Sequence, residues 1–126
     1  MDAVSGWFLT APEPPAAQPD FVNGVARLSG TIAPDALLAW LQAFEANAGR
    51  SRAAPNAARP LDLDIIAMGD LVRDRPDPIL PHPRAHLRRF VLVPLAEVAP
   101  GWVHPVLRRS VEALIAALPP TAIRAV

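Results

Sequence analysis

Two acidic residues separated by a single residue are the clearest chemical signal in the sequence. Asp62 and Asp64 lie in the stretch Arg-Pro-Leu-Asp-Leu-Asp-Ile-Ile, residues 59–66. On a β-strand, alternate side chains share a face, so these carboxylates would lie about 6–7 Å apart, with Leu63 and Ile65 turned towards a core. Neighbouring carboxylates repel each other unless a cation lies between them, and hard oxygen ligands suit Mg²⁺. The spacing therefore favours a magnesium site; the alternative is the solvated face of an edge strand.

Arginines lie on both sides of this acidic pair. The upstream ones, in a loop of small residues, are Arg50, Arg52 and Arg59, and the downstream ones are Arg84, Arg88 and Arg89. Guanidinium groups bind phosphate oxygens in a forked geometry, and metal ions bridge the phosphates of a nucleotide. Carboxylates and arginines together are typical of a nucleoside triphosphate site, although any single arginine is better explained as a solvated surface charge.

The elements that would position these groups follow from the hydrophobic pattern. Apolar runs predict strands over residues 4–10, 21–32 and 61–68, the last carrying the acidic pair. Pro34 predicts the start of the longest helix, which continues through apolar residues at helical spacing to a cap near Gly49.

Two further helical segments are predicted in the C-terminal half. Residues 84–89 predict a helical turn, and Ser110 is a suitable N-cap for a last helix that ends at Leu118. Glu112 would lie favourably in the first turn of that helix. Proline-rich stretches at 11–19 and 76–83 predict extended loops.

Composition narrows the class of protein. A chain of 126 residues suffices for one domain, expected over 1–126. The formal net charge of zero argues against a general nucleic-acid or anionic-membrane binder. No apolar run reaches the roughly 18–20 residues of a membrane span. Cysteine is absent, which excludes disulfides and thiolate metal sites, and Asp2 stands where a signal peptide would be basic. A cytoplasmic location is expected.

Several separated motifs, in order, resemble one known family. They are Thr10-Ala-Pro, the segment from Gln18 to Asn23, residues 59–66, Pro-His-Pro-Arg at 81–84, Arg88, Phe90, and residues 94–100. This pattern, from about Val4 to about Ala117, resembles 6-hydroxymethyl-7,8-dihydropterin pyrophosphokinases. One departure is Asn56-Ala57-Ala58-Arg59, where many members carry Trp-Gly-Pro-Arg, so the tryptophan's stacking role is unfilled.

The resemblance implies an ATP-dependent transfer of pyrophosphate to the pterin's hydroxymethyl group, with release of AMP, in folate biosynthesis. Asp62 and Asp64 would hold two Mg²⁺ ions. The residues expected to bind ATP are Gln42, Glu45, His82 and Arg88. The expected catalytic residues, in or beside a mobile catalytic loop at 50–60, are Arg50, Arg52 and Arg59.

The resemblance also implies a pterin site. Phe21 and Phe90 would stack on the two faces of the pterin, and Thr10 and Asn23 would hydrogen-bond its polar edge. A pterin has apolar faces and a rim of donors and acceptors, so two rings and an amide suit it. Without the resemblance, core packing would explain both phenylalanines equally well.

The implied fold is α+β, a ferredoxin-like α/β sandwich with helices packed on an antiparallel sheet. Because the family begins with a strand and helix that have no counterpart here, we expect a form truncated at the N-terminus. A monomer is expected for the full-length family, and a dimer if the truncation is real. The alternative function is a catalytically inactive remnant that binds nucleotide or pterin, or an interaction module.

Overall fold

The computed structural model describes residues 2–10, 21–50, 62–119 and 123–125. The chain divides into two compact units. The first unit combines Met1–Gly30 with Pro83–Val126, and the second is Thr31–His82. Each unit is described by itself below.

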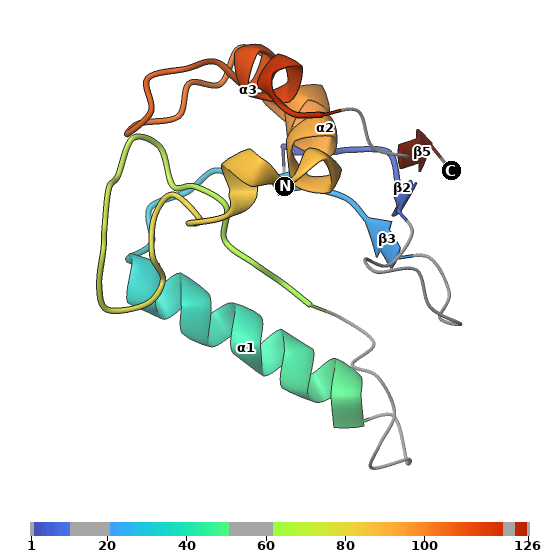
Figure 1. Ribbon diagram of the computed structural model, residues 1–126. Coiled ribbons are helices and arrows are strands. Elements are labelled where there is room, and N and C mark those ends of the chain that lie inside the picture. The colour runs from blue at the N-terminus through green and yellow to red at the C-terminus, as the bar shows by residue number, and fades with distance from the viewer. Residues whose placement is uncertain (1, 11–20, 51–61, 120–122, 126) are drawn as a thin grey trace. The chain divides into compact units, whose positions relative to one another are not determined.

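Short antiparallel strands open and close the first unit (Figure 1). Strand β1 (Ala3–Val4) pairs with β4 (Ala26–Arg27). Strand β2 (Phe8–Thr10) lies between β3 (Phe21–Asn23) and β5 (Ile123–Ala125), and both pairings are antiparallel. The first two sequence-predicted strands therefore exist, but each is divided into two shorter ones.

Side-chain contacts explain the division of the first predicted strand. The Ser5 hydroxyl accepts a hydrogen bond from the Val25 amide at 2.8 Å and donates one to the Gly6 carbonyl at 2.7 Å. The Gly6 amide in turn donates to the Glu97 carboxylate at 2.7 Å. These backbone groups bond to side chains instead of a neighbouring strand, so the ladder is interrupted between β1 and β2.

The second predicted strand is interrupted at Gly24. A Cβ at this position would lie 2.9 Å from Cε3 of Trp7, closer than real Cβ atoms approach ring carbons. The indole of Trp7 therefore occupies the space that any larger residue at position 24 would need.

Helices supply most of the buried apolar side chains of the first unit. They are the short 3₁₀ helix η1 (Ala85–Leu87), α2 (Arg89–Val98) and α3 (Val111–Ala117). The buried apolar side chains of these helices are Ala85, Leu92, Pro94, Leu95, Val98, Val111 and Leu114. The predicted N-cap of the last helix is confirmed, because the Ser110 hydroxyl accepts a hydrogen bond from the Ala113 amide at 3.1 Å.

A buried histidine organises the loop between α2 and α3. His104 is 5% exposed, and its Nδ1 accepts hydrogen bonds from the amides of Val106 at 3.2 Å and Leu107 at 3.0 Å. Burial lowers the pKa of His104 below 6.5, and the nearby His86 lowers it further. A ring nitrogen that accepts two amide protons must be unprotonated, so the geometry and the pKa agree on a neutral imidazole.

The second unit is built on the long helix α1 (Pro34–Arg50). Its start at Pro34 confirms the sequence prediction, because proline fits the first turn, where its missing N–H costs nothing. The rings of Trp40 and Phe44, one turn apart, meet edge to face with centroids 4.7 Å apart.

The strand predicted over residues 61–68 is not a sheet strand in the described residues. Residues 62–68 run as an extended segment that follows α1 in sequence (Figure 1). In this segment Ile66 accepts a backbone hydrogen bond from His82 at 2.8 Å, and Met68 accepts one from Leu71 at 3.1 Å. Alternation of side chains fixes the faces of a strand, but a ladder also needs a neighbouring strand.

The chain then forms a closed loop before it leaves the second unit. Arg73 and Leu80 pair as an antiparallel bridge, with both backbone hydrogen bonds at 2.8 Å. The X–Pro bonds before Pro76, Pro78 and Pro81 are cis.

Candidate functional site

The acidic pair occupies the exposed side of the segment 62–66. Asp62 and Asp64 are both exposed, whereas Leu63 and Ile65 are half-buried. This is the alternation that the sequence predicted, and it leaves two carboxylates on the solvent side of one backbone segment. Both side chains thus face solvent.

A helix residue holds the backbone between the two carboxylates. The Glu45 carboxylate accepts a hydrogen bond from the Leu63 amide at 2.7 Å. Sequence analysis assigned Glu45 to ATP and did not foresee this contact, since nothing in the local pattern connects residues 18 positions apart. Gln42 is exposed three residues earlier on α1, so it lies on the same side of the helix as Glu45.

His82 lies at the far end of the same segment. Its amide donates to the Ile66 carbonyl at 2.8 Å, which brings His82 beside the segment that carries the acidic pair. The second unit therefore gathers five of the predicted site residues, which are Gln42, Glu45, Asp62, Asp64 and His82.

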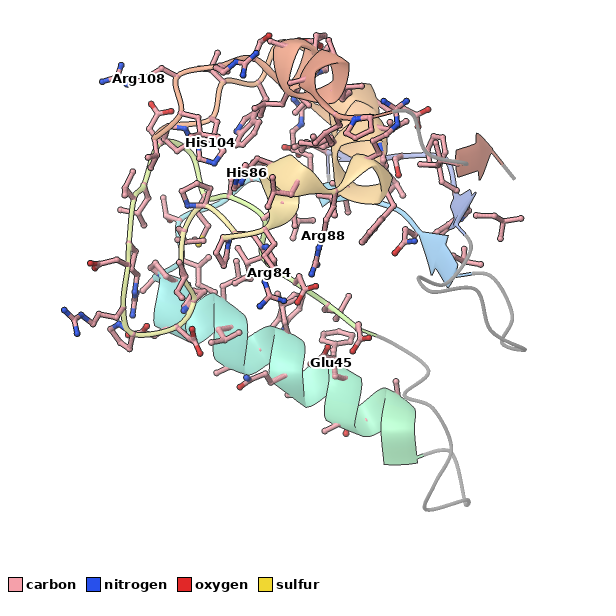
Figure 2. All side chains as sticks on the ribbon, viewed as in Figure 1. Glu45, Arg84, His86, Arg88, His104 and Arg108 are labelled. Carbon is pink, nitrogen blue, oxygen red and sulfur yellow. The ribbon has the colours of Figure 1, made fainter. Side chains whose placement is uncertain are left out.

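In the first unit, an arginine and an aromatic ring meet at the start of α2. Arg88, the residue before α2, places its guanidinium carbon 5.6 Å from the centroid of the Phe90 ring, a cation–π contact. Figure 2 shows Arg84 and Arg88 leaving the two ends of η1 in the same direction. Arg84 was named with Arg88 among the arginines downstream of the acidic pair, and the two flank η1.

Strand register relates the remaining predicted pterin residues. Strands β2 and β3 pair Thr10 with Phe21 and Phe8 with Asn23. Residues directly opposite in an antiparallel pair occupy one face, so these four positions share a face of the sheet. Asn23 is half-buried, whereas the side chains of Thr10 and Phe21 lie outside the described part.

The side chains of the predicted catalytic arginines lie outside the described part of the structure. Arg50 is the last residue of α1, and its side chain is not among those described. Arg52 and Arg59, with the rest of the predicted catalytic loop, fall in 51–61, outside the described residues.

The chemistry of the described donors limits how a metal could be held. Among the residues that the structure describes, no group of three or more His, Cys, Asp or Glu side chains could enclose a metal ion. Two exposed carboxylates still fit Mg²⁺, because this ion keeps several waters and is commonly bound through one or two carboxylates together with substrate phosphates. None of the described helices is both long and apolar enough to cross a membrane.

The described elements define a small α+β protein with antiparallel strands and helices, and comparison with known proteins identifies its family. Residues 1–100 match the family model of 7,8-dihydro-6-hydroxymethylpterin-pyrophosphokinase (HPPK). The chain belongs to this family.

Individual relatives agree with this assignment. The chain is 38% identical over 123 residues to a 2-amino-4-hydroxy-6-hydroxymethyldihydropteridine pyrophosphokinase of Synechocystis sp., covering 98% of this chain and 63% of that protein. It is 45% identical over 117 residues to the enzyme of the same name from Pseudomonas aeruginosa, covering 93% of this chain and 72% of that protein. A folic acid synthesis protein, FOL1, of Dictyostelium discoideum is 32% identical over 107 residues, covering 85% of this chain and 16% of that protein. The chain thus spans a little under two thirds of the Synechocystis relative.

Proposed function

We propose that this protein transfers pyrophosphate from ATP to the hydroxymethyl group of 6-hydroxymethyl-7,8-dihydropterin, with release of AMP, as a step in folate biosynthesis. The proposal rests mainly on the segment of residues 62–66, which carries two exposed carboxylates. Asp62 and Asp64 are exposed on one side of a backbone that Glu45 and His82 hold in place. Membership of the family, whose relatives carry this activity in their names, supports the same conclusion.

Asp62 and Asp64 would hold Mg²⁺, two ions in the full complex. The bound metal would neutralise charge on the β- and γ-phosphates and orient them. Each ion would complete its coordination with phosphate oxygens and water.

The other residues would bind and orient the two substrates. Gln42 and Glu45 lie on the helix beside the acidic segment and would contact the nucleotide, while His82 and Arg88 would contact its phosphates. Arg50, Arg52 and Arg59 are proposed to neutralise the charge that develops during transfer. Phe21 and Phe90 would stack on the pterin, and Thr10 and Asn23 would hold its edge.

In the reaction, the hydroxymethyl oxygen forms a bond to the β-phosphorus of ATP. The bond from that phosphorus to the oxygen bridging the α-phosphate breaks, and AMP leaves with that oxygen. The hydroxyl proton passes to solvent. The chain's contribution is to align the two substrates and to compensate charge, because this class of transfer needs little covalent participation from the protein.

The finer features of the fold belong to the same proposal. We infer a ferredoxin-like arrangement with one domain over 1–126 and a cytoplasmic location. The chain would act without nucleic acid.

The test is release of AMP from ATP, measured with and without the hydroxymethyl-dihydropterin. The variants are Asp62→Asn and Asp64→Asn, and the matched control is Asp70→Asn, an exposed carboxylate in the turn that follows the segment. We expect pterin-dependent AMP release that falls about 100-fold or more in either variant, equivalent to roughly 2.7 kcal/mol or more of barrier, and is unchanged in the control.

Calorimetric titration with a non-hydrolysable ATP analogue and Mg²⁺ separates binding from turnover. Metal-dependent binding that requires both aspartates, without AMP release, would favour a non-catalytic binding module. Full activity in the Asp62→Asn and Asp64→Asn variants would refute the proposed role of the acidic pair.

A further inference from the structure

Arg73 connects the loop of residues 73–80 with helix α1 in the second unit. Its backbone pairs with Leu80, and this pairing closes the loop between them. Within that loop its Nε donates to the Pro76 carbonyl at 2.9 Å, and its NH2 group lies 3.4 Å from the Asp77 carbonyl. The same NH2 group forms an ion pair with Asp35, in the first turn of α1.

The Arg73–Asp35 ion pair joins a shielded guanidinium to a carboxylate that is 71% exposed. The Arg73 side chain is only 18% exposed, and its planar fork distributes donors to several acceptors at once. Asp35 lies at a helix N-terminus, where the helix dipole favours a negative charge. The contact therefore fixes the loop to the start of α1.

The loop ends directly at His82. Leu80 is 1% exposed, and Pro81, which follows it, is also buried. The next amide, that of His82, donates to Ile66. A single residue, Pro81, separates the Arg73–Leu80 pairing from His82, so the position of the loop is transmitted to His82 through a short and stiff connection.

We propose that Arg73 is a positioning residue, which sets His82 against the segment 62–66 by tying the loop to Asp35. Glu45 fixes the same segment to the other half of α1, through Leu63. Helix α1 thus acts as a common support for the acidic pair and for His82. The catalytic meaning of this inference rests on the proposed function, in which His82 contacts the phosphates of ATP.

The chain provides a matched control. Arg75 and Asp74 lie in the same loop and are exposed. Across the residues that the structure describes, neither joins the loop to α1. Arg73→Met should therefore disturb His82, and Arg75→Met should not. Asp35→Ala removes the acceptor on the helix and leaves the carbonyl contacts of Arg73 intact, with Asp74→Ala as its control.

Histidine side-chain NMR measures the effect without reference to activity. The chain has three histidines, and His86 and His104 belong to the first unit, so they act as internal reporters of folding. In Arg73→Met and in Asp35→Ala we expect the His82 ring signals to move by more than their linewidth, while those of His86 and His104 stay in place. If His82 does not move in Asp35→Ala, or moves equally in Arg75→Met, the inference is wrong.

Steady-state kinetics of the protein and its variants then test whether Arg73 affects the binding of Mg–ATP. We expect KM for Mg–ATP to rise about tenfold in Arg73→Met, which corresponds to roughly 1.4 kcal/mol of lost binding, while kcat falls less than KM rises. Arg73→Lys keeps the charge opposite Asp35 and should recover part of this loss.

The two proposals fail in different ways. An unmodified protein that neither binds Mg–ATP nor releases AMP would overturn the proposed function and, with it, the catalytic role of Arg73. An active protein whose Arg73→Met and Arg75→Met variants share one KM would overturn the role of Arg73 alone.

Discussion

Replacing Glu45 by alanine removes the carboxylate that accepts a hydrogen bond from the Leu63 amide, the backbone group between the two metal-binding candidates. The bond is 2.7 Å long and both residues are half-buried, so its partner amide would be only partly rehydrated in the variant. Hydrogen bonds to charged groups contribute about 1.5–3 kcal/mol, and partial exposure favours the lower half of that range. We expect Glu45→Ala to lower the free energy of unfolding by about 1.5–2 kcal/mol.

Urea unfolding followed by tryptophan fluorescence measures this change, because Trp40 lies on α1 itself, little more than one turn before Glu45. With a denaturant slope of about 2 kcal/mol per molar, the midpoint should fall by roughly 0.75–1 M. Glu45→Gln keeps a carbonyl acceptor and should lose less than half as much. Gln42→Ala, an exposed position on the same helix, serves as the control. If the midpoints of Glu45→Ala and Gln42→Ala coincide, the carboxylate does not hold the segment and the reasoning is refuted.

Two other perturbations test the first unit. Because the pKa of His104 in the folded protein is below its unfolded value of 6.5, the stabilisation from its neutral ring is complete above pH 6.5 and is lost as the pH falls through the folded pKa. We therefore expect the midpoint for urea unfolding to decrease between pH 7.5 and 5, and His104→Asn to flatten this dependence; an equally steep profile in the variant would contradict it. Arg108 has a φ of 59°, in the left-handed region. Arg108→Gly should relieve that strain and raise stability by about 0.5–1 kcal/mol after the added flexibility of the unfolded chain is subtracted, measured as the melting temperature, whereas Arg109→Gly should lower it.

Features that depend on neighbouring residues were predictable from the sequence. The start of α1 at Pro34 follows from the conformation of proline, and the N-cap at Ser110 follows from a hydroxyl within reach of the amide three residues on. The alternation of Asp62 and Asp64 with apolar residues was likewise visible, because in an extended chain the side-chain direction changes with every residue.

Sheet pairing was less predictable. The apolar runs at 4–10 and 21–32 gave no sign that each would be divided. The division depends on the Ser5 hydroxyl and on the indole of Trp7 against Gly24, contacts between segments about 20 residues apart. The predicted strand at 61–68 illustrates the same limit, since alternation cannot specify which segment, if any, will pair with it.

The sequence by itself determined which groups are present and which way they face: two carboxylates on one side of a segment, arginines around them, and aromatic residues suited to a flat ring. Tertiary structure alone decided how those groups are supported. Glu45 reaches Leu63 across 18 residues, and Arg73 reaches Asp35 across 38. Such bonds leave no periodic trace in the sequence, because they depend on where separate segments pack and not on local backbone geometry.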